Sequence, residues 1–244
     1  MRSVSASELL GVWEQGLAQR PVQRALTLLT TACPETSPEE LAKLSIGQRD
    51  ARLLALREWT FGHQLISLAT CPSCGQRLEL TFNVADIQVA TEVEPKETLA
   101  LSVADYEVHF RPPNSLDLAA IADQKDVATG RQRLLESCLM AVHQNGEQVS
   151  ADQLPANIRE AVVEQMAQAD PQADVQVPLS CPECGHQWQA HFDIVSFFWS
   201  EIDAWATRTL RDVHVLASAY GWREADILGM TPWRRHRYLE LVAR

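Results

Sequence analysis

The chain has 244 residues, of which 46% are hydrophobic and 22% charged, as is usual for a globular protein of one large or two small domains. Its formal net charge of −11 argues against a nucleic-acid-binding protein, because contacts to phosphates require a basic surface. No apolar stretch approaches the roughly 18 residues of a membrane span, and the N-terminus lacks the apolar core of a signal peptide. We therefore expect a cytoplasmic protein with reduced cysteines and no membrane contact.

The sequence predicts helices throughout an N-terminal region, residues 1–62. Ser7 is placed to cap a first helix, and Pro21 to open a second, because proline is favoured in the first helical turn. Ser37 is the N-cap of a short third helix with a capping box. Apolar residues at helical spacing predict a further helix that ends at Gly62.

The first half of a zinc ribbon is predicted at residues 63–98, together with an acidic linker. At its centre lies a tight turn that directs two thiols toward one point, Cys71-Pro72-Ser73-Cys74-Gly75. Gly75 permits the positive φ that such a turn needs. Alternating apolar and polar residues predict flanking strands over residues 64–70 and 77–84.

An α/β insertion is predicted at residues 99–172. The alternation across residues 99–111 predicts two strands joined by a turn at Ala104-Asp105. Helical periodicity then predicts three helices, over residues 116–123, 127–144 and 155–169. Asn145-Gly146 is expected to end the second of these helices.

The second half of the ribbon is predicted at residues 173–195, where the turn motif recurs as Cys181-Pro182-Glu183-Cys184-Gly185. Strands are expected over residues 175–180 and 187–194. The repeat extends past the cysteines, because Phe82 matches Phe192 and Val84 matches Ile194 at the same offset.

Two such turns supply four thiolates, the ligand set of a closed structural site for one zinc ion. The predicted ligands are Cys71, Cys74, Cys181 and Cys184. Disulfides or a redox pair are the alternatives, but a redox pair requires a helix after each motif, and here a strand follows. Iron remains open, because tetrahedral sulfur suits both metals. Cys33 and Cys138 have no partner motif and are expected to be buried apolar residues.

C-terminal helices are predicted over residues 196–244. Apolar residues every three or four positions indicate a long helix over residues 195–220, ended by Gly221. Two short helices follow, over residues 222–228 and 232–242. The last carries a basic run of Arg234, Arg235 and Arg237, which forms either a solvated face or a docking contact for an acidic partner.

No motif of a catalytic site occurs in the sequence: it has no HExxH, no GxSxG, no phosphate-binding glycine loop and no GxGxxG. A binding or assembly protein is therefore expected, not an enzyme. The predicted fold class is α+β, mainly helical, with a split four-cysteine zinc ribbon, an α/β insertion and a C-terminal helical segment.

Three C-terminal stretches carry a resemblance to a known family. They are residues 193–203, the segment 213–228 with its Leu-Ala-Ser-Ala-Tyr-Gly-Trp sequence, and the Arg-Arg-containing helix at 232–239. Together they resemble the signature of the T-even-phage-type baseplate hub assembly chaperones. The paired cysteine turns resemble the longer, zinc-binding bacterial members, which occur with contractile tail and extracellular injection-system genes.

The resemblance implies a non-enzymatic chaperone that binds an unassembled baseplate or hub subunit of a phage-tail-like contractile particle. The predicted partner surface consists of Tyr220, Trp222, Ile227, Leu228 and Trp233; these residues alternatively pack the helices on each other. Two other functions stay open: a permanent structural component of the particle, and a zinc-ribbon nucleic-acid adaptor, which the net charge opposes.

Overall fold

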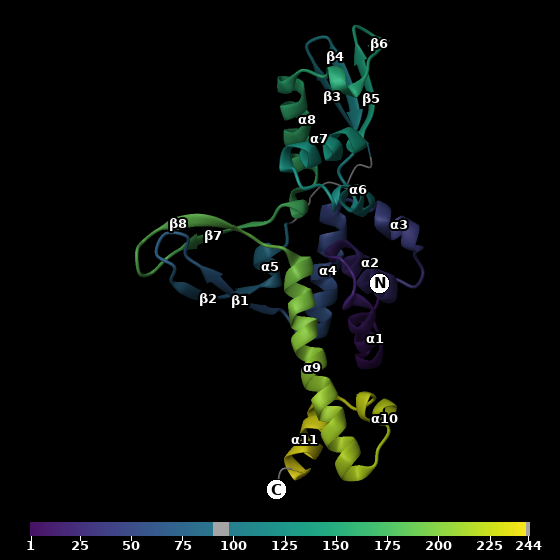
Figure 1. The fold of residues 1–244 in the computed structure, drawn as a ribbon, viewed down its shortest axis with the longest axis vertical. Coiled ribbons are helices and arrows are strands. Elements are labelled where there is room, and N and C mark those ends of the chain that lie inside the picture. The colour runs from purple at the N-terminus through teal and green to yellow at the C-terminus, as the bar shows by residue number, and fades with distance from the viewer. Residues whose placement is uncertain (90–97, 243–244) are drawn as a thin grey trace. The chain divides into compact units, whose positions relative to one another are not determined.

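A computed structural model describes residues 1–89 and 98–242, and its fold is α+β and mainly helical, as predicted (Figure 1). The chain forms two compact units, one of residues 1–36 with 194–244 and the other of residues 37–193. The five-part division of the sequence stays a prediction, and residues 90–97 of its acidic linker lie outside the described residues. Among the described helices, none is long and apolar enough to cross a membrane.

The first unit consists of helices from both ends of the chain. They are α1 (Ala6–Gly16), α2 (Pro21–Ala32), α9 (Ile194–Tyr220), α10 (Glu224–Leu228) and α11 (Pro232–Val242). The predicted cap at Ser7 is wrong: Ser5 caps α1, and the side chain of Glu8 accepts a hydrogen bond from the Ser5 backbone in return. The sequence offers three serines at this end, Ser3, Ser5 and Ser7, and only Ser5 has a Glu three residues later, which completes a capping box.

Helix α9 supplies the apolar face on which the other helices of the unit pack. Ile202, Ala206 and Leu216 are completely buried along it, and residues of α1 and α10 pack against the same face. Gly16 of α1 lies directly against the Trp199 ring, where a Cβ atom would come within 2.1 Å of the ring. The helix ends at Tyr220, as predicted, because Gly221 adopts a φ of +67°.

The second unit contains the ribbon and the insertion. Its helices are α3 (Pro38–Lys43), α4 (Ile46–Phe61), α5 (Val84–Ile87), α6 (Ser115–Ile121), α7 (Val127–Cys138) and α8 (Ala156–Ala169), with short 3₁₀ turns η1 (Ala151–Gln153) and η2 (Pro171–Ala173). Its strands are β1 (Gln64–Thr70), β2 (Arg77–Asn83), β3 (Leu99–Val103), β4 (Tyr106–Phe110), β5 (Leu139–Gln144), β6 (Glu147–Gln148), β7 (Gln176–Ser180) and β8 (Gln187–His191).

The insertion is built on a four-stranded antiparallel sheet in the order β3-β4-β5-β6. The predicted helix over residues 127–144 is wrong in its last third, because α7 ends at Cys138 and β5 pairs with β4. The apolar run over residues 139–144 is compatible with the periodicity of a helix or of a strand. Pairing with β4 selects the strand. Asn145 and Gly146, both with positive φ, form the hairpin turn to β6 and do not end a helix.

Two buried side chains hold the ends of the insertion together. Gln172 accepts a hydrogen bond from the backbone N–H of Val89 (2.7 Å) and donates to the carbonyl of Ile87 (3.4 Å). Asp170 accepts a hydrogen bond from the backbone N–H of Gly47 at the start of α4 (2.9 Å). The segments that enter and leave the insertion are thereby fixed beside each other, which brings the two ribbon halves back together.

Candidate metal centre

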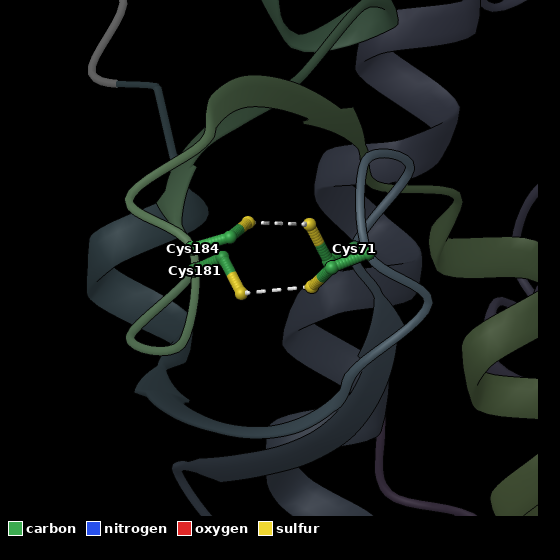
Figure 2. Close-up of side chains that lie close together, drawn as sticks. Cys71, Cys181 and Cys184 are labelled. Atoms are coloured by element: carbon green, nitrogen blue, oxygen red, sulfur yellow. Dashed lines mark hydrogen bonds between the residues drawn. The ribbon is translucent and has the colours of Figure 1, made fainter.

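The structure brings the four predicted cysteines into one cluster, although two pairs about 110 residues apart supply them. Their sulfur atoms all lie within 4.8 Å of one another. Cys71 Sγ is 3.7 Å from Cys184 Sγ, and Cys74 Sγ is 3.6 Å from Cys181 Sγ. Figure 2 shows the thiols of the two turns directed toward each other. The cluster can hold one metal ion.

The sulfur spacing agrees with the size of a tetrahedral metal–thiolate site. A Zn–S bond of about 2.3 Å places the corners of a sulfur tetrahedron about 3.8 Å apart. The Cys71–Cys184 and Cys74–Cys181 sulfur distances match this edge to within about 0.2 Å. The donor set is all sulfur and provides four ligands, so zinc would find a closed coordination shell without water.

Each pair of cysteines is held by the same turn. In the first, the backbone N–H of Cys71 donates to the carbonyl of Gln76 (2.8 Å), and that of Gly75 donates to the carbonyl of Cys71 (2.9 Å). In the second, Cys181 and Gly185 repeat these two bonds, both at 2.9 Å. Both glycines have the predicted positive φ, +76° and +70°. The first cysteine of each turn is buried and the second exposed.

The likeness of the two halves extends along their strands. Residues 66–83 and 176–193 follow one pattern of buried, half-buried and exposed positions, residue for residue. In both hairpins the half-buried side chains form a single face, because neighbouring residues point to opposite sides of a strand. These faces meet at Phe82 and Phe192, whose rings lie edge to face at 5.8 Å. The two hairpins are thus two copies of one strand–turn–strand motif, and they share the thiol cluster.

Hydrogen bonds within the cluster separate the pKa values of the thiols. Burial opposes ionisation of Cys71, but donation from the backbone N–H groups of Cys74 and Ser73 and from neighbouring thiols lowers its pKa to about 7. At Cys74 the backbone N–H of Gln76 stabilises the thiolate and lowers the pKa. Hydrogen bonds to the other thiols, first that of Cys184, have the larger effect and raise the pKa of Cys74 to about 12. Four thiolates at this spacing repel one another, so complete deprotonation requires a cation among them.

The remaining cysteines stand apart from this cluster. Cys33 and Cys138 are both buried. Burial, with the nearby Asp117 carboxylate, raises the pKa of Cys138 to about 11, which makes it an inert thiol. His186 belongs to the second turn but stacks on Trp188, with ring centroids 5.9 Å apart. Among the described residues, the metal-ligand cluster contains the four turn cysteines and not this histidine.

The residues of the predicted partner surface have different environments. Ile227 and Leu228 are buried in the core of the first unit. Tyr220 stacks on Trp222, with ring centroids 4.5 Å apart, and Tyr238 lies edge-on to both. Trp233 is 70% exposed. The partner surface stays a prediction. Trp233 has the largest exposed fraction of the five predicted residues.

The surroundings of Trp233 were not predicted from the sequence. The guanidinium of Arg237 lies over the Trp233 ring, 5.3 Å from its centroid. Arg235, expected with its neighbours on a solvated face or in a docking contact, is instead buried and forms an ion pair with Asp212 at 3.3 Å. The spacing of Trp233 and Arg237, four residues apart on a helix, is the signal that predicts their contact.

Comparison with known proteins identifies relatives of the chain. A family model described as T4 bacteriophage base plate protein matches residues 7–199. The baseplate hub assembly protein gp26 of Enterobacteria phage T4 is 25% identical over 123 residues, which are 46% of this chain and 52% of that protein. The chain therefore spans about half the length of this relative. No solved structure gives a significant match.

Proposed function

Since the chain belongs to the T4 bacteriophage base plate protein family, we propose that it is a non-enzymatic assembly chaperone for the baseplate hub of a phage-tail-like contractile particle. It binds an unassembled baseplate or hub subunit in the cytoplasm and leaves before the particle is complete. The observation that carries the proposal is the family match over residues 7–199, which includes both halves of the ribbon. The similarity to a hub assembly protein favours assembly over a permanent structural role.

In this proposal the metal is structural and is zinc. Cys71, Cys74, Cys181 and Cys184 hold one ion, whose charge balances the thiolates and joins the two hairpins. Zinc leaves the purified protein colourless, whereas iron in a four-thiolate site gives a red protein with visible absorption bands. Elemental analysis that finds one zinc per chain supports the assignment, and iron or no metal contradicts it.

The experiment that tests the function separates free protein from assembled particles. The tagged chain is captured from its own host, both from the soluble extract and from sedimented particles, and its partners are identified by mass spectrometry. A chaperone captures a baseplate or hub subunit in the soluble extract and is missing from the particles. Its presence in intact particles shows a structural component instead, and capture of no tail protein contradicts both functions.

A further inference from the structure

The outward face of α11 is the least covered apolar surface of the first unit. Trp233 and Leu241 are 70% and 57% exposed, and they lie eight residues apart, two turns along one side of the helix. Arg237 stands between them and covers part of the Trp233 ring. Tryptophan and arginine are both among the residue types enriched at the residues that contribute most of the binding energy in protein interfaces.

The orientation of this face is fixed by the opposite side of α11. There Arg235 is 6% exposed and binds Asp212 of α9 through an ion pair at 3.3 Å. Tyr238 packs against Trp222, with ring centroids 4.8 Å apart. With its inner side held by a buried charge pair and an aromatic contact, the helix presents Trp233, Arg237 and Leu241 away from α9 in one fixed arrangement.

The charge of this helix is opposite to that of the larger unit. Residues 232–242 contain three arginines and one glutamate, a formal net charge of +2. Residues 37–193 contain 23 acidic and 11 basic residues, a formal net charge of −12. The single acid of α11, Glu240, already pairs with Arg237 at 2.8 Å. An acidic partner is therefore repelled by most of the chain and attracted to this helix.

We infer that the exposed face of α11, formed by Trp233, Arg234, Arg237 and Leu241, is the docking surface for an acidic, apolar-containing segment of the partner protein. This inference rests on the proposed function, since the partner is the unassembled baseplate subunit. The apolar side chains of the segment cover Trp233 and Leu241, and its carboxylates bind the arginines. Ile227 and Leu228 support the surface from the core and do not touch the partner.

Matched variants test this surface through the capture experiment. Trp233→Ala and the double variant Arg234→Glu/Arg237→Glu should each retain less than about a tenth of the captured subunit. Trp59→Ala removes a tryptophan that is 50% exposed on α4, and Arg131→Glu/Arg133→Glu reverses two exposed charges on α7; both should capture as much as the wild type. Circular dichroism and melting temperature should be unchanged in all four variants.

The outcomes separate the docking surface from the function as a whole. If the wild type captures a baseplate subunit and the α11 variants capture it equally well, the docking surface is wrong while the assembly role stands. If the wild type captures no tail protein, both are wrong. A photoreactive benzoylphenylalanine in place of Trp233 should crosslink to a partner peptide rich in Asp and Glu. Crosslinking to a basic peptide, to nucleic acid or to a second copy of this chain overturns the inference.

Discussion

The ribbon and the helical unit of residues 1–36 and 194–244 are held together by different interactions. Along the ribbon hairpins most inward side chains are only half-buried, and each half brings one completely buried cysteine to the thiol cluster. In the helical unit, α9 has a continuous row of buried apolar side chains that α1 and α10 cover. With the proposed zinc ion, the ribbon would depend on the metal for closure, whereas the helices depend on apolar packing. Each region can therefore be disrupted separately.

The largest expected effect comes from removing two ligands from the ribbon. Cys71→Ser/Cys181→Ser should abolish metal binding, which contributes on the order of 10 kcal/mol to the folding of small zinc domains. Amide hydrogens of β2 and β8 should lose protection in hydrogen exchange, and those of α9 should keep it. Cys33→Ser, at a buried cysteine outside the cluster, is the control and should retain one metal per chain. Loss of protection in α9 would show that the two regions are not independent.

The converse change weakens the helical unit and leaves the ribbon intact. Ile202 is completely buried on α9, so Ile202→Ala should reduce the free energy of unfolding of this unit by about 2–5 kcal/mol. Leu210→Ala, on the same helix but 37% exposed, should cost much less. Denaturant unfolding measures both, and the zinc content should be unchanged. Equal effects at the two positions would contradict the packing described for α9.

A smaller effect is expected where α1 approaches α9. Gly16→Ala places a methyl group 2.1 Å from the Trp199 ring, and the required shift should cost about 1–3 kcal/mol. Gly11→Ala on the same helix is a matched control, because beyond its chain neighbours and the adjacent backbone of α1 no described atom lies within 4 Å of the added carbon. It should stabilise the protein by about 0.5–1 kcal/mol, since alanine is the better helix former. Melting temperatures should therefore move in opposite directions.

The smallest effect concerns an ion pair in the larger unit. Burial alone would raise the pKa of Asp117, but hydrogen bonds from Arg111 and the backbone N–H of Asn114 outweigh it and lower the pKa. A lowered pKa stabilises the fold above the unfolded-state value, about 3.9, and this contribution is lost as the pH falls through the folded-state value. The stability difference between wild type and Asp117→Asn should therefore shrink below about pH 4. Loss of the proposed zinc ion in acid would affect both proteins equally, so the difference in stability between them isolates Asp117. A difference that is independent of pH would contradict the assignment.

The ribbon strands could be predicted from the sequence to within three residues, since the strand expected to reach residue 194 ends at His191, and the insertion could be predicted only in part. In the ribbon, the cysteine turns and the period-two strands indicate the same structure, so local and tertiary signals agree. Over residues 139–144 the apolar pattern suits helix and strand alike, and the choice depends on pairing with β4, which lies far away in sequence. Likewise, nothing local distinguishes the buried Arg235 from its exposed neighbour Arg234; the difference arises from Asp212 on another helix.

The split arrangement of the ribbon also sets the order in which the molecule can be completed during translation. A ribosome adds about 5–20 residues per second, so the second pair of cysteines emerges roughly 5–20 s after the first. Helices α1 and α2 likewise cannot pack against α9 until the chain beyond Ile194 has been synthesised. Both the thiol cluster and the helical unit are thus completed only by about the last quarter of the chain. In a nascent chain that stalls before Cys181, Cys71 and Cys74 lack the second pair of turn cysteines, and α1 and α2 lack α9. Cellular quality control can recognise such exposed thiols and apolar helix faces.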